Sequence, residues 1–563
     1  MLMKRLNVLL AISMVILGLL VFGCQSVNNS TDNSSSNNSN NSNKIEFVDS
    51  GNMPKIITEI NGTYCGTWSS SQYFDGSKAV PISDRWTLRQ VVRTSIGGEK
   101  IRLSFTNREG ESEMVINSVH IAKADGQGTG RIFTDTDTIV PFNGKSGVSI
   151  PAGEDVTSDT FEFSFEPLTE LAITIYYETL PGKITGHVGA RANSFYSPGN
   201  CLSLDKLPFF GKFTQWYTIS AIDVLSEKEN KAVVCFGDSI TDGRGTTDDK
   251  NNRWSDVLAT RLQNNEATKN VAVLNQGIGA TTVTGNGVAR FNTDVLEQTG
   301  LSYVIMLYGI NDIIYANASA DSIINTYKSM ISKLHKKNVL VYGGTILPFG
   351  ASTNDYNANR EKVRQTVNKW IRETSSANGG FDAVIDFDAA VTDGNADKPS
   401  MKKEYMYDGL HPGPAGYKAM GDAIDLDLFT KTGNYNVEDL KSSFRAQNIE
   451  QFWFALPKTL NLGKKVVVNV KGTNNGKTGF RCWTVGDSPW DRTSDVNTEA
   501  LGDKLPSGDF DRTFTIVSTG NSKSFLLKAA NPGEKIDDII ISSIIFTIDG
   551  KEYSVDPGAE VQK

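Results

Sequence analysis

The sequence predicts an α/β fold in which a parallel sheet carries the chemistry, with a β-sandwich domain before it and another after it. Two observations predict this. Between about residues 231 and 430, short apolar runs alternate with long amphipathic segments, as strands alternate with helices. Before and after that stretch, short runs with a period of two residues lie between turn signals, which is typical of antiparallel β-structure.

The composition is that of a folded protein with several domains. The chain has 563 residues, 39 % hydrophobic and 21 % charged, and about 150 residues per domain predicts three to four domains. This composition excludes whole-chain disorder and collagen-like or coiled-coil classes. The net charge of −8 and the lack of a basic run argue against a nucleic-acid partner. None of the five cysteines forms a CxxC pair, so we expect no structural zinc site, and their scatter gives no readable disulfide framework.

The N-terminus has the pattern of an exported protein. A basic start precedes an apolar run over residues 8–22, which is short for a membrane-spanning helix. The run closes in VFGC, ending at Cys24, and this resembles a bacterial lipobox. The resemblance implies a lipoprotein signal peptide over residues 1–24, lipidation of Cys24, and an extracellular cell-surface protein anchored to the membrane. An uncleaved signal anchor is the alternative, and it also places the rest of the chain outside the cytoplasmic membrane.

Two segments follow before the α/β stretch. Residues 25–44 are almost all Ser, Asn and other polar residues, so they cannot form a core and predict a linker with an end-to-end distance of roughly 25 Å. Residues 45–228 then show period-two alternation, as at residues 101–105, 114–120 and 171–177. This pattern predicts an N-terminal β-sandwich domain.

Residues 229–432 are the predicted α/β domain. The expected strands are residues 232–236, 271–275, 303–307, 338–343 and 382–386, and the expected helices are residues 253–265, 319–335, 355–376 and 414–429. Strand–helix alternation predicts a parallel sheet covered on both faces. In such sheets the functional site lies at the carboxyl ends of the strands.

Residues 433–563 return to the β pattern and predict a C-terminal β-sandwich. Several aromatic residues lie in or near its expected strands: Phe452, Trp453, Phe454, Trp483 and Trp490. Exposed rings on such a surface would stack on sugars, so the domain is a candidate carbohydrate-binding module. The alternative is that these rings belong to the core, which we expect for at least half of them.

Polar residues follow the expected strands of the α/β domain at four places. Ser239 comes directly after the first strand, Gly277 after the second and Asn311 after the third, and Asp408 and His411 lie beyond the last. These types are the parts of a serine hydrolase. A serine attacks, a histidine takes its proton, an aspartate holds the histidine, and N–H donors stabilise the oxyanion.

These four blocks together resemble the SGNH, or GDSL-type, hydrolase family, although the first block reads GDSI rather than GDSL. The resemblance implies a three-layer, flavodoxin-like domain with Ser239, Asp408 and His411 as catalytic residues. It implies an oxyanion hole of the Ser239 N–H, the Gly277 N–H and the Asn311 amide, with no cofactor and no metal. Segments at residues 66–68, 87–93 and 102–107 also resemble the N-terminal β-domain of extracellular bacterial SGNH esterases.

The other chemically interesting residues have plainer interpretations. His120, His187 and His335 have no partner motif, and we interpret them as structural. Asp238 and Asp242, which flank Ser239 in sequence, are interpreted as carboxylates that hold the loop.

The sequence therefore predicts an SGNH-family carboxylic ester hydrolase at the cell surface. The expected reaction is hydrolysis of small acyl esters, O-acetyl above all, on an acylated carbohydrate polymer or oligosaccharide. The alternatives are a short-chain lipase or thioesterase, a transferase using the same acyl-enzyme, and a carbohydrate-binding surface protein. The intact four blocks argue against the last of these.

Overall fold

The structure is a computed structural model. It describes residues 53–76, 81–126, 128–208, 210–435, 444–476, 480–486, 492–494, 508–529, 533–555, 557 and 561. The expected lipobox Cys24, the expected linker over residues 25–44 and Trp490 lie outside these residues. No helix among the described residues has the length and apolar character needed to cross a membrane.

The chain divides into two compact units. The first runs to Gly433, apart from His335–Lys337, and these three residues belong with the second unit, which holds the residues from Asn434 onwards. The N-terminal β-rich region and the α/β region thus share one unit. The boundaries expected from sequence for three separate domains stay a prediction.

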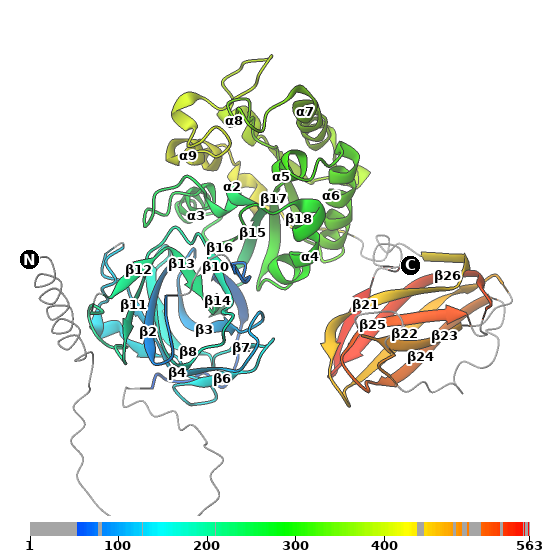
Figure 1. The fold of residues 1–563 in the computed structure, drawn as a ribbon, viewed down its shortest axis with the longest axis horizontal. Helices are drawn as coiled ribbons and strands as arrows, with labels where there is room; N and C mark the ends of the chain where they lie inside the picture. The colour runs from blue at the N-terminus through cyan, green and yellow to red at the C-terminus, as the bar shows by residue number, and fades with distance from the viewer. Residues whose placement is uncertain are drawn as a thin grey trace, which may run out of the picture. The chain divides into compact units, whose positions relative to one another are not determined.

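Five parallel strands form the central sheet of the first unit (Figure 1). They are β15 (Lys231–Gly237), β16 (Val271–Gly277), β17 (Leu301–Leu307), β18 (Leu340–Gly344) and β19 (Ala383–Ile385). Their order is β16-β15-β17-β18-β19, and every adjacent pair is parallel. The sheet is as expected, and its apolar runs are buried because helices cover parallel strands. The chain reverses its direction of winding beside β15, and such a switch point is where crevices open in α/β sheets.

The helices of this region lie close to their expected positions. They are α2 (Ser239–Asp242), α3 (Trp254–Gln263), α4 (Val288–Phe291), α5 (Ile310–Ile314), α6 (Ala320–His335), α7 (Ala358–Glu373), α8 (Phe387–Val391) and α9 (Pro414–Asp422). The helix expected over residues 414–429 is too long, because α9 ends at Asp422 and a separate 3-10 turn spans Leu426–Thr430. The Asp425 carboxylate accepts the Asp427 N–H and starts that turn.

The N-terminal β-rich region contains three antiparallel sheets. Its strands are β1 (Thr63–Ser69), β2 (Trp86–Arg93), β3 (Gly98–Thr106), β4 (Met114–Lys123), β5 (Thr138–Ile139), β6 (Val148–Ile150), β7 (Asp155–Thr157), β8 (Phe161–Phe165), β9 (Glu170–Thr179), β10 (Gly186–Val188), β11 (Ser194–Pro198), β12 (Gly211–Phe213), β13 (Gln215–Tyr217) and β14 (Ile219–Ser226). The larger sheets have the orders β1-β14-β3-β7, with β8 on β3, and β12-β11-β2-β9-β4-β5, with β6 on β4.

This region covers the β16 edge of the parallel sheet. Ser70, next to the end of β1, forms a parallel bridge with Asn275 of β16. The Val273 N–H donates to Ser95 Oγ at 3.0 Å, and the Gly66 N–H donates to the Thr299 carbonyl at 3.0 Å. An edge strand needs such partners for its backbone groups, so the N-terminal region completes the parallel sheet.

The second unit is β-rich, with its own core. Its strands are β20 (Phe444–Ile449), β21 (Gln451–Leu460), β22 (Lys465–Asn474), β23 (Phe480–Val485), β24 (Gly508–Val517), β25 (Ser522–Ala529), β26 (Ile536–Ile548) and β27 (Lys551–Val555). Phe452 and Phe454 are 1 % and 0 % exposed, so these two rings belong to the core. Arg492 covers the Trp483 ring at 4.5 Å. Sugar binding by this unit stays a prediction.

Candidate active site

The Ser239 side chain is placed by a tight turn at the end of β15. Ser239 begins α2, and the Asp238 carboxylate accepts the Ile240 N–H at 3.0 Å to cap that short helix. Gly237 leaves no space for a side chain, since a Cβ there would lie 2.5 Å from the Leu307 carbonyl oxygen. Gly243 ends the turn at φ +96°, a conformation that favours glycine.

His411 and Asp408 come from the loop before α9. Ser239 Oγ lies 2.8 Å from His411 Nε2, and His411 Nδ1 lies 2.9 Å from each oxygen of the Asp408 carboxylate. The His411 backbone N–H also donates to Asp408 Oδ1 at 2.9 Å. Gly409 has φ +82°, which turns the chain so that a carboxylate three residues earlier can reach the ring. The structure therefore brings the three expected catalytic residues together.

Their electrostatic surroundings suit a neutral base beside an ionised acid. Burial, with further effects of the Arg244 and Arg191 charges, lowers the pKa of His411 below its ordinary value. Although burial opposes ionisation of Asp408, hydrogen bonds from the His411 N–H and ring hold the pKa of this carboxyl below its usual range. Ser239 and His411 are each 7 % exposed, which leaves the reacting atoms partly open to a substrate.

Asn311 and Asp312 connect two loops beside the serine. Gly309, at φ +105°, turns the chain after β17 into α5. The Asn311 amide then donates to the Thr281 carbonyl at 2.9 Å, and the Asp312 carboxylate accepts the Val283 and Thr284 N–H groups at 2.8 and 2.9 Å. Asn311 is in place as an amide donor, and Asp312 holds the loop after β16.

Gly277 does not fit the oxyanion role expected from the sequence. Its N–H donates to Asn275 Oδ1 at 2.9 Å and is therefore occupied. Gly277 is still the last residue of β16, paired with Gly237 of β15. A Cβ at Gly277 would lie 2.2 Å from the Asp242 backbone nitrogen, so this glycine lets α2 pack on β16.

The residues just beyond Gly277 are better placed, and the sequence analysis missed them. A Cβ built on Gly279 would lie 3.8 Å from Ser239 Cβ, so this residue is next to Ser239. Ala280 follows with φ +61°, the left-handed conformation. Within the described part of the chain, neither N–H has a hydrogen-bond partner. The end of the expected strand could have indicated these two residues. Only a residue beyond the last paired residue of β16 can direct its N–H away from the sheet.

Sequence analysis also missed a contribution from the N-terminal region. His187, on β10, is 4 % exposed, with Nε2 lying 2.7 Å from Asp242 Oδ1 and Nδ1 lying 2.8 Å from the Ser71 carbonyl oxygen. Both ring nitrogens of His187 thus lie within hydrogen-bond distance of a polar atom, one on each side of the ring. Arg191 Nη2 approaches the other Asp242 oxygen at 3.3 Å. Asp242 ends the helix that Ser239 begins, so this contact holds the nucleophile turn.

Asp238 is the most strongly perturbed carboxyl at this site. Burial, with a further effect of the Asp312 charge, raises its pKa to about 7, although the Ile240 N–H bond opposes the shift. Asp238 is thus placed as a cap, as interpreted from the sequence. Among the described residues, no cluster of three or more His, Cys, Asp or Glu side chains could hold a metal ion.

The chain was compared with known proteins. Residues 235–419 match the model of the GDSL-like Lipase/Acylhydrolase family. Similar solved structures include a lipolytic protein of the G-D-S-L family from Desulfitobacterium hafniense (23 % identity, 34 % of this chain and 97 % of that chain covered, TM-score 0.28). Another is the lipase/acylhydrolase from Enterococcus faecalis, with 22 % identity, 36 % of this chain and 97 % of that chain covered, and a TM-score of 0.28. A third is a variant of an acetyl-xylooligosaccharide esterase from Geobacillus Stearmophilus, with 19 % identity, 35 % of this chain and 94 % of that chain covered, and a TM-score of 0.29. No curated protein matches.

The family match spans the parallel sheet from within β15 to within α9, and it includes Ser239, Asn311, Asp408 and His411. Residues 235–419 are therefore a domain of the GDSL-like lipase/acylhydrolase family, an α/β hydrolase domain with a parallel sheet.

Proposed function

We propose that this protein is a serine esterase that hydrolyses small acyl esters, O-acetyl above all, through an acyl-enzyme on Ser239. The observation that carries the proposal is the unbroken contact from Ser239 Oγ to His411 Nε2 at 2.8 Å and from His411 Nδ1 to Asp408 at 2.9 Å. This arrangement gives a hydroxyl a base for its proton and gives the base a carboxylate that fixes its tautomer.

The reaction follows in two halves. Ser239 Oγ attacks the ester carbonyl carbon while His411 Nε2 takes its proton, and the carbonyl oxygen becomes an oxyanion. When the intermediate collapses, the alcohol leaves with the proton from His411, and the acyl group stays on Ser239. A water then attacks the acyl-enzyme, with His411 again taking a proton, and the acid is released. The lowered pKa of His411 keeps it neutral, and so able to accept a proton, at pH 7.

For the oxyanion we propose the Asn311 amide and the N–H groups of Ser239, Gly279 and Ala280. Gly279 lies against Ser239, and Ala280 follows it in a left-handed turn, which directs successive N–H groups to one side. Such donors stabilise the charge that develops in the transition state, at about 3 kcal/mol for each in comparable hydrolases.

The substrate proposal is an acylated carbohydrate polymer or oligosaccharide. It rests on the export signal with its lipobox-like Cys24, on the polar segment over residues 25–44, and on the two β-rich regions. With it we propose a lipid-anchored, extracellular location, a three-layer, flavodoxin-like catalytic domain and two β-sandwiches. Loss of radiolabelled-lipid incorporation in Cys24→Ala would test the anchor.

The deciding experiment measures acetate release from acetylated xylans, mannans and pectins beside hydrolysis of p-nitrophenyl acetate and a long-chain ester. We expect acetate from at least one polymer, and a fall in turnover of at least ~10⁴-fold in Ser239→Ala, with an unchanged circular dichroism spectrum. Retained turnover in the folded variant would remove Ser239 from the nucleophile role. Activity on the long-chain ester alone would make the protein a lipase.

A further inference from the structure

Four aromatic rings gather on the N-terminal β-rich region. Trp86 of β2 and Tyr196 of β11 stack at 5.9 Å between ring centroids, and Phe210 packs edge-on against Trp86 at 4.9 Å. Phe213 of β12 lies 5.5 Å from Tyr196. Phe210 is 56 % exposed and the other three are half-buried. Single exposed rings are ordinary on protein surfaces, but a cluster marks an interaction site.

One of the four rings, Tyr196, lines a hollow of about 200 Å³ together with Pro208, Gly211, Lys206 and Lys212, among others. We call the four rings and this hollow the aromatic groove. Pockets that enclose a whole small ligand usually measure about 300–1,000 Å³. The hollow therefore suits one ring of a longer chain, with the rest of that chain lying along the surface. Gly211 makes room for Tyr196, because a Cβ there would lie 2.1 Å from Tyr196 Oη.

A buried arginine fixes the shape of the groove. Arg89 is 0 % exposed and donates from Nε to Thr174 Oγ1 at 2.9 Å. Its four remaining N–H groups donate to the carbonyls of Gly130, Leu202, Leu204 and Asp205 at 2.8 to 3.1 Å. All five donors are used, which offsets the cost of burying the charge. Arg89 therefore ties to β2 both Gly130, which lines the hollow, and residues 202–205, which directly precede the lining residue Lys206.

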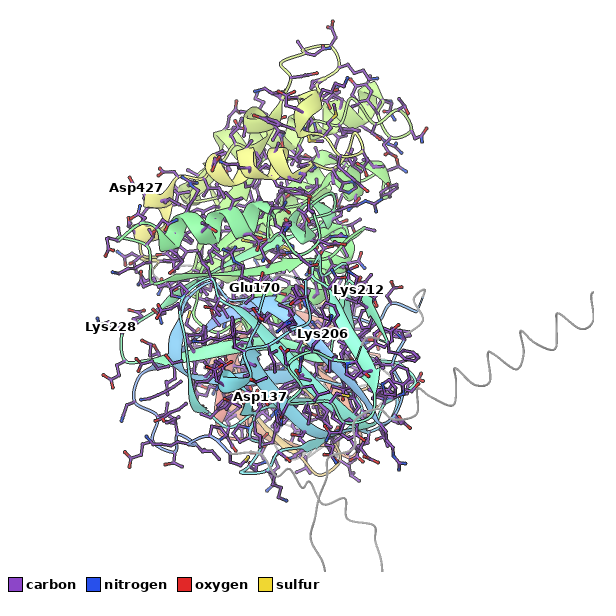
Figure 2. All side chains as sticks on the ribbon, turned by 90° about the vertical axis from the view of Figure 1, so that its left-hand side faces the viewer. Asp137, Glu170, Lys206, Lys212, Lys228 and Asp427 are labelled. Carbon is purple, nitrogen blue, oxygen red and sulfur yellow. The ribbon has the colours of Figure 1, made fainter. Side chains whose placement is uncertain are left out.

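The groove carries uncompensated positive charge. Lys206 and Lys212 are exposed and line the same hollow, and Figure 2 labels both on one side of the β-rich region. Within the described residues neither lysine has an ion-pair partner, and the nearby Asp205 pairs with Arg131 at 3.1 Å. Because the chain as a whole has a net charge of −8, two free lysines beside stacked rings are a local exception that attracts an anion.

The groove also leads toward the catalytic turn. Gly128 lines the aromatic groove and lines a second crevice that contains His187, Asp249 and Asp242. A Cβ on Gly128 would lie 2.3 Å from Asp249 Oδ2, so these two loops touch. Asp242 is the last residue of the helix that begins with Ser239. The aromatic groove and the crevice lined by Asp242 therefore share Gly128.

We propose that the aromatic groove is a binding site for an anionic polysaccharide. The C–H faces of its sugar rings pack on Trp86 and Tyr196, and its carboxylates pair with Lys206 and Lys212. Rings alone would serve a neutral glycan and lysines alone any polyanion, so the combination selects a chain that is both sugar and anion. This site is distinct from the catalytic residues, and the proposal does not depend on Ser239 being the nucleophile.

Affinity electrophoresis of the full chain tests the proposal. Native gels containing polygalacturonate, neutral xylan or polyglutamate compare wild type with Tyr196→Ala, Trp86→Ala and the double variant Lys206→Ala/Lys212→Ala. We expect polygalacturonate to retard the wild type most, and each variant to bind it about tenfold more weakly or worse. Retardation of the wild type should fall with added salt, and this dependence should shrink in the double lysine variant.

Two matched variants separate the groove from general effects. Tyr196→Phe keeps the ring and should bind like wild type, and Lys228→Ala removes an exposed lysine outside the groove (Figure 2) and should also bind like wild type. Hydrolysis of p-nitrophenyl acetate should stay unchanged in all these variants, and Ser239→Ala should bind normally. Equal retardation by polyglutamate, equal retardation by neutral xylan, or wild-type binding by Tyr196→Ala would each overturn the proposal.

Discussion

The two β-rich regions share the same alternating sequence pattern, but they differ in the side chains that they bury. The C-terminal region closes around an apolar core that includes Phe452, Phe454 and Phe546, and its ion pairs, such as Lys458 with Asp549 at 2.7 Å, are exposed. The N-terminal region has apolar cores too, but where it meets the parallel sheet it buries polar groups, with Ser71 and His187 in hydrogen-bond contact with the catalytic domain.

Buried polar contacts distinguish a region that supports the site from a region that forms a separate unit. Burying a polar group is costly unless the group has a hydrogen-bond partner. A set of buried hydrogen bonds between two regions, which we call a joint, therefore fixes the position of one region against the other. An apolar core only holds its own unit together. The N-terminal region should therefore matter to catalysis, and the C-terminal region, a compact unit of its own, should not.

The largest expected effect comes from breaking the joint at His187. In His187→Leu, the buried Asp242 carboxylate loses its 2.7 Å partner, and leaving a buried charged acceptor without that partner costs about 3 kcal/mol or more of the unit's unfolding free energy. Because Asp242 belongs to the nucleophile helix, kcat on p-nitrophenyl acetate should fall by more than KM rises. Calorimetry and steady-state kinetics check both.

Two companion variants sharpen this result. His187→Gln keeps one donor for Asp242 and should recover part of the loss. Lys458→Ala removes an exposed C-terminal ion pair and should leave melting and kinetics unchanged. If His187→Leu had the melting temperature and the kinetics of the wild type, the proposed difference between the two regions would be wrong.

A smaller loss is expected from the hydroxyl beside this joint. Ser71 Oγ donates to Gln276 Oε1 at 2.6 Å and accepts from Arg290 Nη1 at 2.9 Å. Ser71→Ala leaves both buried partners less satisfied, so the unit should lose about 1–3 kcal/mol of unfolding free energy. Denaturant unfolding of the variant measures this. A loss as small as that of Lys458→Ala would mean that water replaces the hydroxyl.

The charge of Arg191 should act on the catalytic base. Its positive charge disfavours protonated His411 and contributes to the lowered pKa of that residue. Arg191→Gln removes the charge, so the pKa of His411 should rise. Since the reaction needs neutral His411, the acid limb of the kcat/KM profile should move to higher pH. If the acid limb of the profile does not move, the N-terminal region does not influence the pKa of His411.

The smallest expected effect comes from removing residues 434–563. The first unit keeps its own core and the whole site, so kcat/KM for p-nitrophenyl acetate should stay within about twofold. Kinetics on the truncated chain measure it. A tenfold loss would place the C-terminal region in catalysis after all.

The sequence predicted the parallel sheet and the meeting of Ser239, Asp408 and His411 because these depend on local patterns. Strand–helix alternation sets the order of elements, and the polar residues come directly after strands, so topology brings them to one edge.

What the sequence could not predict depends on packing. Gly277 and Gly279 look equivalent in the sequence, and only the end of β16 shows which one lies beyond the sheet. His187 has no motif, because its partner Asp242 is 55 residues away and is reached through the tertiary fold. The end of α9 at Asp422 likewise follows from a cap at Asp425 that the apolar pattern does not reveal.

The five hydrogen bonds of Arg89 have a consequence for how this region folds. Its acceptors come from positions 41 to 116 residues away in the chain, on three separate segments. Until all three arrive, the guanidinium either stays in water or is buried without partners, and the second state is costly. A state that holds only one or two of these segments is therefore destabilised, and we expect β2, β9 and the two loops to open together, which hydrogen exchange of their backbone amides would measure.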